Sequence, residues 1–201
     1  MHRTMRTLRP AAAVLTALAL AACGGETATE PADVASSAPA TDATGGAASL
    51  NDADVTFLQG MVPHHSQATE MAEMVPDRTD DPEVNSLADE IVAAQTEEIE
   101  TMNGLLEQAG EDPVEPMGAM DTSGMDMSGM MSDEQMGELE GLEGEPFVQR
   151  WTQMMTEHHR GAIESAQTVL ADGENPEVAT LAEEIIQAQE AEIEEMEQIA
   201  A

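Results

Sequence analysis

Two histidine doublets are the residues of this chain whose type and spacing point most directly to chemistry. His64-His65 and His158-His159 lie 94 residues apart, and a methionine stands four residues before the second histidine of each pair, at Met61 and Met155. Residues four apart share one face of a helix, so each doublet presents two imidazoles and a thioether along about one turn. Imidazole alone suits zinc, nickel or Cu(II), and the added thioethers favour copper. The spacing therefore predicts a copper site.

The doublets are part of an internal duplication. With a shift of 94 residues, about 21 of 46 positions are identical between residues 57–102 and residues 151–196. The later part of each copy repeats a Gln, a Glu and a Met at i, i+3 and i+7, which places them on one helix face. The predicted ligands are Met61, His64, His65, Glu98, Met102, Met155, His158, His159, Glu192 and Met196. An alternative stays open, in which core histidines pair with the two glutamates and the methionines fill gaps in the core.

A second group of methionines lies between the two copies. Seven of them fall within 20 residues that are otherwise small or acidic, so burial in a core explains them poorly. Thioethers are soft ligands for Cu(I) and bind without losing a proton. The predicted secondary soft-metal loop consists of Met117, Met120, Met125, Met127, Met130 and Met131, and Met136 follows them. The alternative is a flexible linker that is prone to oxidation.

Apolar spacing predicts that each copy is a helix, a short loop and a second helix. The second helices have clear starts, because Asp81-Pro82 and Asn175-Pro176 combine an N-cap residue with a proline at the first helical position. Two antiparallel hairpins predict an all-α, up-down four-helix bundle of the ferritin-like kind over residues 50–201. The connector 111–144 carries the methionine-rich segment.

Several residues mark where these helices should bend or end. We expect Pro63 to kink the first long helix, and Gly110 and Gly173 to serve as C-terminal caps. Ser132 begins a capping-box pattern, which predicts a short helix that ends near Glu140. Gly144 lies in the segment expected to separate that short helix from the third long one.

The N-terminus is predicted to direct export and lipidation. Residues 1–22 combine three arginines with an apolar run of about a dozen residues, which is too short for a membrane-spanning helix. The run ends in Leu20-Ala-Ala-Cys23, and this resembles the lipobox of bacterial lipoproteins, in which the cysteine is lipidated. Residues 23–49 then form a small and polar tether, which we expect to be disordered. The predicted location is the outer face of the cytoplasmic membrane or the cell envelope.

Composition excludes several classes of protein. A net charge of −35, from 41 acidic and 6 basic residues, repels phosphate and argues against binding nucleic acid. There is no tyrosine, and aromatic residues make up 1% of the chain, so large sheets are not expected. With a single cysteine, no intrachain disulfide can form.

The paired motifs resemble those of the family called domain of unknown function 305 (DUF305). The first copy supplies Phe57-x-x-x-Met61-x-Pro-His64-His65, and the second supplies Met155-Thr-Glu-His158-His159. The resemblance spans residues 50–200 and implies a ferritin-like four-helix bundle. It also implies a relation to periplasmic copper-binding members that are linked to copper resistance. By this resemblance, the family's paired Met and His-His motifs fall on Met61, His64, His65, Met155, His158 and His159. In the second copy Ser165 and Thr168 stand where the first has Met71 and Met74, so we expect the second site to be poorer in sulfur.

Three functions follow from these residues. The first is an extracytoplasmic copper-binding lipoprotein without enzymatic activity or organic cofactor, which sequesters copper or hands it to an accepting protein. The second is an acidic helical module that docks a partner in the cell envelope. The third, a ferritin-like iron oxidase, is disfavoured because such sites use Glu-x-x-His, whereas methionine stands three residues before His64 and before His158.

Overall fold

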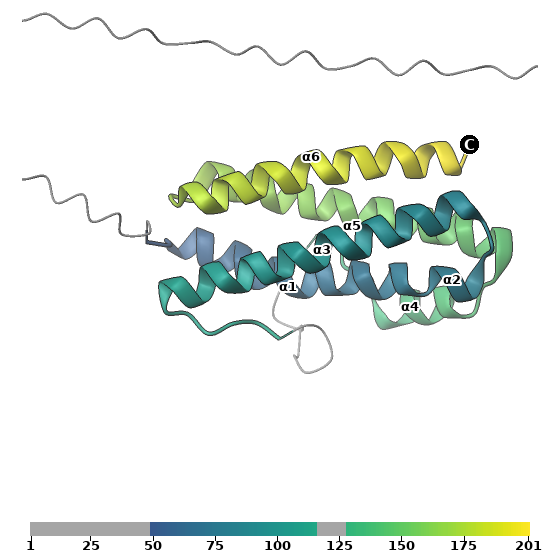
Figure 1. The fold of residues 1–201 in the computed structure, drawn as a ribbon, viewed down its shortest axis with the longest axis horizontal. Helices are drawn as coiled ribbons and strands as arrows, with labels where there is room; N and C mark the ends of the chain where they lie inside the picture. Colours follow the sequence, from purple (N-terminus) through teal and green to yellow (C-terminus); the bar gives the residue numbers. More distant parts are fainter. Residues whose placement is uncertain (1–48, 116–127) are drawn as a thin grey trace, which may run out of the picture. The chain divides into compact units, whose positions relative to one another are not determined.

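A computed structural model describes residues 49–115 and 128–201, which fold into six helices without a strand in that part of the chain. The helices are α1 (Asp52–Glu73), α2 (Val75–Arg78), α3 (Pro82–Ala109), α4 (Asp133–Glu140), α5 (Gly144–Asp172) and α6 (Pro176–Ile199). The four long helices α1, α3, α5 and α6 form a bundle (Figure 1). The predicted all-α bundle is confirmed. The predicted signal peptide, Cys23 and nearly all of the tether lie outside the described residues.

The bundle consists of two antiparallel hairpins. Helix α1 packs mainly on α3, and α5 mainly on α6, while α1 also contacts α5 and α3 contacts α6. Helices α1 and α5 are antiparallel, because Asn51 at the start of α1 donates to the carbonyl of Asp172, and Trp151 early in α5 donates to the carbonyl of Met71. The long helices therefore run up, down, down and up (Figure 1). The connector between α3 and α5 is the single long crossover found in ferritin-like bundles.

Most of the predicted helix ends are present. Asp81 and Asn175 accept hydrogen bonds from the first backbone N–H groups of α3 and α6, and each helix has proline in its first turn. Ser132 and Gln135 form the capping box of α4, which ends at Glu140. Gly110 caps α3 in the left-handed conformation, with φ 84°. Local sequence is therefore sufficient to define these boundaries.

Other boundaries differ from the sequence-based expectation. Helix α1 ends at Glu73, where the short α2 follows; Pro63 lies inside α1 as expected, and the kink expected there stays a prediction. Helix α5 already begins at Gly144, before Pro146. Pro146 is tolerated because it lies in the first turn of the helix, where the N–H that proline lacks would have no partner. Gly173 is the C-cap residue of α5, as expected, but its backbone is extended, with φ −77° and ψ 160°. A Cβ at Gly173 would lie 2.4 Å from the Asp54 carboxylate, so glycine is required there for close packing and not for a left-handed cap.

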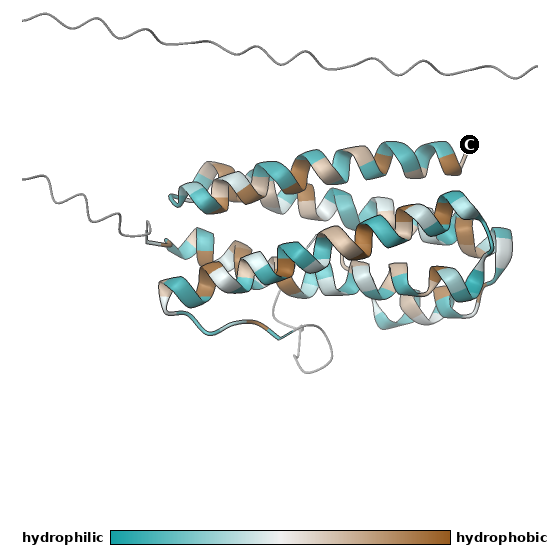
Figure 2. Cartoon of the chain, in the orientation of Figure 1, coloured by the Kyte–Doolittle hydropathy of each residue, from teal (hydrophilic) through white to brown (hydrophobic). Residues whose placement is uncertain are grey.

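The bundle interior has two apolar clusters. One contains Trp151, Phe147, Met155 and Met196, and the other contains Phe57, Met61 and Met102, each with further aliphatic side chains. Hydrophilic and hydrophobic residues alternate along each long helix in Figure 2, as expected for helices with one buried face. The four histidines of the doublets are fully buried but belong to neither apolar cluster.

Candidate metal centre

The middle of the bundle holds a stacked pair of imidazoles. His64 of α1 and His158 of α5 have ring centroids 3.8 Å apart and planes inclined by 39°. Both side chains are fully buried. Because α1 and α5 are antiparallel and the two residues are equivalent in the repeat, the duplication brings both doublets into one centre. The sequence predicted that these two residues face inward, but it left open whether the doublets form one site or two.

The second histidine of each doublet pairs with the predicted glutamate. His65 Nε2 donates to Glu98 Oε2 at 2.7 Å, and His159 Nε2 donates to Glu192 Oε2 at the same distance. A carboxylate only accepts hydrogen bonds, so Nε2 carries the hydrogen and the lone pair of a neutral ring lies on Nδ1. Metal-binding histidines commonly have their other ring nitrogen held by a carboxylate in this way. The glutamates therefore orient the rings.

The connector closes over the centre at His64. The carbonyl of Ser128 accepts a hydrogen bond from His64 Nε2 at 3.2 Å. It can approach because Gly129 and Gly161 pack backbone against backbone: a Cβ on Gly161 would lie 1.9 Å from the Ser128 oxygen. Gln67 holds the same segment of the connector. Its side-chain amide donates to the Met131 carbonyl at 2.9 Å and accepts from the Met131 N–H at 2.6 Å.

This connector contact was not predicted from the sequence. Ser128 and Gln67 carry no metal-ligand signature, and their partners are distant along the chain. The available signal was the glycine pair, because Gly161 interrupts a helix whose neighbours are good helix formers, and such a glycine often marks a close approach.

Burial keeps the central imidazoles neutral. Desolvation lowers the pKa of His64 from 6.5 to about 3, with the neighbouring His65 adding to the effect and the Ser128 carbonyl opposing it. Desolvation also lowers the pKa of His158 well below its usual value, and His64 and His159 add to that shift. Neutral imidazole is the form that binds metal, so protons compete little at these two rings.

Several polar atoms of this layer have no hydrogen-bond partner among the described residues. They are Nδ1 of His64, His65, His158 and His159, Nε2 of His158, and both amide atoms of Gln95 and of Gln189. Buried polar atoms normally have partners, and unpartnered ones indicate bound water, an ion or a functional site. Nitrogen lone pairs in a buried layer suit a borderline or soft cation. This chemistry fits copper.

The predicted methionine ligands are buried on both sides of the layer. Met61 and Met102 belong to one apolar cluster, and Met155 and Met196 to the other, each with no exposed surface. The hydroxyl of Thr156 donates to Met196 Sδ at 3.7 Å, whereas Val62 is the equivalent residue in the first copy. The two copies therefore offer thioethers in different surroundings.

The methionine-rich connector is only partly within the described residues. Met131 and Met136 are buried in the apolar core, and Met130 is half-buried. Met117, Met120, Met125 and Met127 lie outside the described residues. Within the described part of the chain, no three His, Cys, Asp or Glu side chains converge in a metal-binding arrangement. A site at the imidazoles would therefore need thioether ligands or movement of the rings away from the glutamates.

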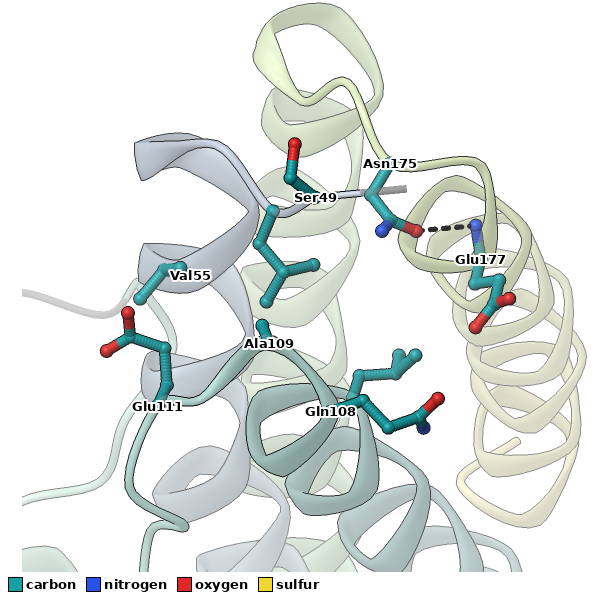
Figure 3. A pocket seen from close by; sticks show the side chains of 9 residues that line it. Ser49, Val55, Gln108, Ala109, Glu111, Asn175 and Glu177 are labelled. Atoms are coloured by element: carbon teal, nitrogen blue, oxygen red, sulfur yellow. Dashed lines mark hydrogen bonds between the residues drawn. The ribbon is translucent and has the colours of Figure 1, made fainter. Parts of the chain in front are cut away.

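A separate hollow of about 260 Å³ lies at the end of the bundle where α1 begins (Figure 3). Its lining includes Val55, Gln108 and Glu111, and none of the predicted ligands. The side-chain oxygen of Asn175 accepts from the Glu177 N–H at 2.8 Å and so caps α6. No imidazole or thioether of the described residues lines this hollow. Among the described helices, none is both long and apolar enough to span a membrane.

Comparison with known proteins agrees with this architecture. A DUF305 protein of Deinococcus radiodurans is 31% identical, covers 76% of this chain and 97% of its own, and superimposes with a TM-score of 0.67. A DUF305 protein of Streptomyces coelicolor, described as secreted, is 36% identical over 73% of this chain and 91% of its own, with a TM-score of 0.63. The protein CopM in its Cu(II)-bound form is 32% identical over 73% of this chain and 95% of its own, with a TM-score of 0.62.

CopM has also been solved with Cu(I) and with Ag bound. A viral relative, the uncharacterized protein L153 of Acanthamoeba polyphaga mimivirus, is 42% identical over 55 residues, which are 27% of this chain and 36% of the viral protein. The sequence pattern of the Domain of unknown function (DUF305) matches residues 54–200. This match covers more than half of the chain and nearly all of the bundle, so the chain belongs to the DUF305 family.

Proposed function

We propose that this protein binds copper at the buried histidine layer and acts as a carrier or store without enzymatic activity. The observation that carries the proposal is the set of four buried imidazoles whose Nδ1 atoms lack partners, while three of the rings are held through Nε2 by a carboxylate or a carbonyl. Copper is the cargo here. His64 and His158 supply the central nitrogens, and Met61, Met102, Met155 and Met196 supply sulfur on either side.

The choice of copper over other metals depends on the thioethers. Zinc would be satisfied by imidazole and carboxylate, and calcium or magnesium by carboxylates alone. A site that combines neutral imidazole with thioether favours Cu(I) and accommodates Cu(II) through nitrogen. The copper-bound and silver-bound states of the relative CopM support the same class of metal.

The proposed location is outside the cytoplasm, with Cys23 carrying the lipid anchor. The similarity to a DUF305 protein that is described as secreted supports export, and the lipobox-like residues support the anchor. C23S should move the protein from the membrane fraction to the soluble fraction of the envelope. Retention of C23S in the membrane fraction would contradict lipid anchoring without affecting the copper proposal.

Competition titration with a Cu(I) chelator tests the metal proposal. M61L/M155L should weaken Cu(I) binding at least about tenfold, because leucine keeps the volume but removes the sulfur. Zinc binding should change little. M71L/M154L is the matched control, since Met71 and Met154 are equally buried but are not predicted ligands. Equal Cu(I) affinity in wild type, M61L/M155L and a variant with all four doublet histidines replaced by alanine would refute the proposal.

A further inference from the structure

Helix α4 fills a groove between the end of α1 and the start of α5. Its Met136 and Leu139 are buried in one apolar cluster with Met71, Phe147 and Trp151. An ion pair of 2.8 Å between Glu138 and Arg150 anchors the outer side of the helix. A short acidic helix is thus held by an apolar face and by one basic residue on the groove.

The duplication creates a second groove of the same kind at the other end of the α1–α5 pair. It has a volume of about 730 Å³. Its lining includes Asp52, Thr56, Phe57, Glu164, Ser165 and Thr168. With the shift of 94 residues, their equivalents on the α4 side are Pro146, Arg150, Trp151, Glu70, Met71 and Met74. No helix of the described ranges 49–115 and 128–201 lies in the second groove.

The chemistry of the second groove differs from that of the groove that holds α4. Phe57 gives the second groove an aromatic floor, as Trp151 does in the groove that holds α4. Thr56, however, stands where that groove has the basic Arg150. Asp52 and Glu164 at the rim are both exposed. An acidic helix such as α4 would meet only like charge there, whereas a basic helix would be attracted. Ser165 in place of Met71 also leaves room for an incoming apolar side chain.

We infer that this groove is a docking site for a partner protein that inserts a short amphipathic helix, with leucine or methionine on its buried face and lysine or arginine on its flanks. The seating of α4 in the equivalent groove sets the length and the apolar face of the occupant, and the acidic rim sets its charge. The inference does not depend on copper binding. Ser128 lines the same groove, and its carbonyl accepts a hydrogen bond from His64 of the candidate metal centre, so the groove and the centre share one residue.

A synthetic peptide can test the inference directly on the full chain. The probe has the sequence of residues 131–142 with its four acidic residues, Asp133, Glu134, Glu138 and Glu140, replaced by lysine. Binding is measured by NMR chemical-shift changes in copper-free protein. The basic peptide should bind at least about tenfold more tightly than the unmodified acidic peptide. Its shift changes should centre on Phe57 and Thr168.

T168W, which fills the groove, should weaken binding of the basic peptide at least about tenfold. T180W is the matched control, because Thr168 and Thr180 are both exposed and both donate to the carbonyl four residues earlier on their helices. Circular dichroism verifies that both variants fold.

Three results would overturn the inference. Equal binding of the basic peptide to T168W and T180W would mean that it binds only through the overall negative charge. A dimer of the chain that T168W abolishes would identify a second copy as the occupant. A gain in peptide affinity on deleting residues 116–127 would identify this chain's own connector as the occupant. Loss of Cu(I) binding in any of these variants would concern the proposed metal centre and would leave the docking inference unchanged.

Discussion

The four doublet imidazoles differ in what their second nitrogens meet. His65 and His159 are held by carboxylates, His64 by the Ser128 carbonyl, and His158 has no partner for either nitrogen among the described residues. His64 of the first copy is therefore held by a hydrogen bond that its equivalent in the second copy, His158, lacks among the described residues. This difference does not follow from the repeat, whose two doublets are identical in sequence. It arises because only one connector links the copies, so only one inner ring can receive its carbonyl.

Removing the charge of the paired glutamates should weaken metal binding without unfolding the bundle. E98Q and E192Q keep an oxygen that accepts from His65 or His159, but they lose the negative charge that makes the imidazole a better ligand. We expect each variant to lower Cu(I) affinity about tenfold, in line with other outer partners of metal-binding histidines. Competition titration measures the change. E97Q, at an exposed neighbouring position, is the control. Unchanged affinity in E98Q and E192Q would show that these pairs serve packing alone.

The metal-free protein should lose stability as the pH falls below about 6.5. Burial lowers the pKa of His64 to about 3 and lowers that of His158 as well, so the unfolded state binds more protons than the folded state in this range. Stability is then complete above the unfolded pKa and decreases below it, by up to about 1.4 kcal/mol per pH unit for each ring. Urea unfolding between pH 7.5 and 5.5, above the usual range of carboxylates, measures the slope. H64N/H158N should reduce it, and an identical slope in that variant would contradict the assignment.

At the scale of the elements, the connector is held by a close backbone approach. A Cβ on Gly161 would overlap the Ser128 carbonyl, so G161A must push the connector away and break its hydrogen bond to His64. We expect a loss of about 1–3 kcal/mol of unfolding free energy, as for other overpacked sites. G104A is the control, because a Cβ there meets nothing within 4 Å and alanine favours the helix by about 0.5–1 kcal/mol. Urea unfolding measures both variants, and equal stability of the two would be inconsistent with the packing described.

The elements also show what could be predicted from sequence. Helix starts at Asp81 and Asn175, the capping box at Ser132 and the inward position of the doublets follow from local rules and from the repeat, and the structure has all of them. The docking of Ser128 on His64 joins residues 64 positions apart and depends on the missing side chain of Gly161. No local periodicity encodes such a contact. The start of α5 at Gly144 differs from the expectation for a simpler reason: Pro146 lies in the first turn of α5, where the N–H that proline lacks would have no partner in the helix.

At the scale of the whole molecule, a strongly acidic surface surrounds a centre of neutral ligands. The net charge of −35 attracts cations to the surface. In the proposed function, the inner imidazoles and thioethers would then select among these cations by softness, since neither carries a charge of its own at pH 7. If the proposal holds, the surface and the centre serve different steps, accumulation of cations and selection among them. The same surface charge must also oppose folding, because few cations are available to neutralise it.

Salt should therefore stabilise the metal-free protein. Only two arginine–glutamate pairs, Arg150–Glu138 and Arg160–Glu197, are found among the described residues, so most carboxylates there have no arginine partner to offset their mutual repulsion. Sodium chloride shortens the Debye length from about 30 Å at 0.01 M to about 3 Å at 1 M, which screens this repulsion. We expect the melting temperature to rise by several degrees over that range. A decrease would mean that attractive ion pairs outweigh repulsion.

A variant with less charge separates screening from other effects of salt. Glu97, Glu190 and Glu194 are exposed and lie on α3 or α6. Among the described residues none of the three forms an ion pair with a cation, so replacing all three by glutamine removes three negative charges and leaves the core unchanged. If repulsion is the cause, the triple variant melts at a higher temperature than wild type in 0.01 M salt and gains less from added salt. Because carboxylates also draw cations to the surface, the same variant should bind copper more slowly at low salt while its final affinity stays the same. A change in affinity equal to that of M61L/M155L would instead place the metal on the surface.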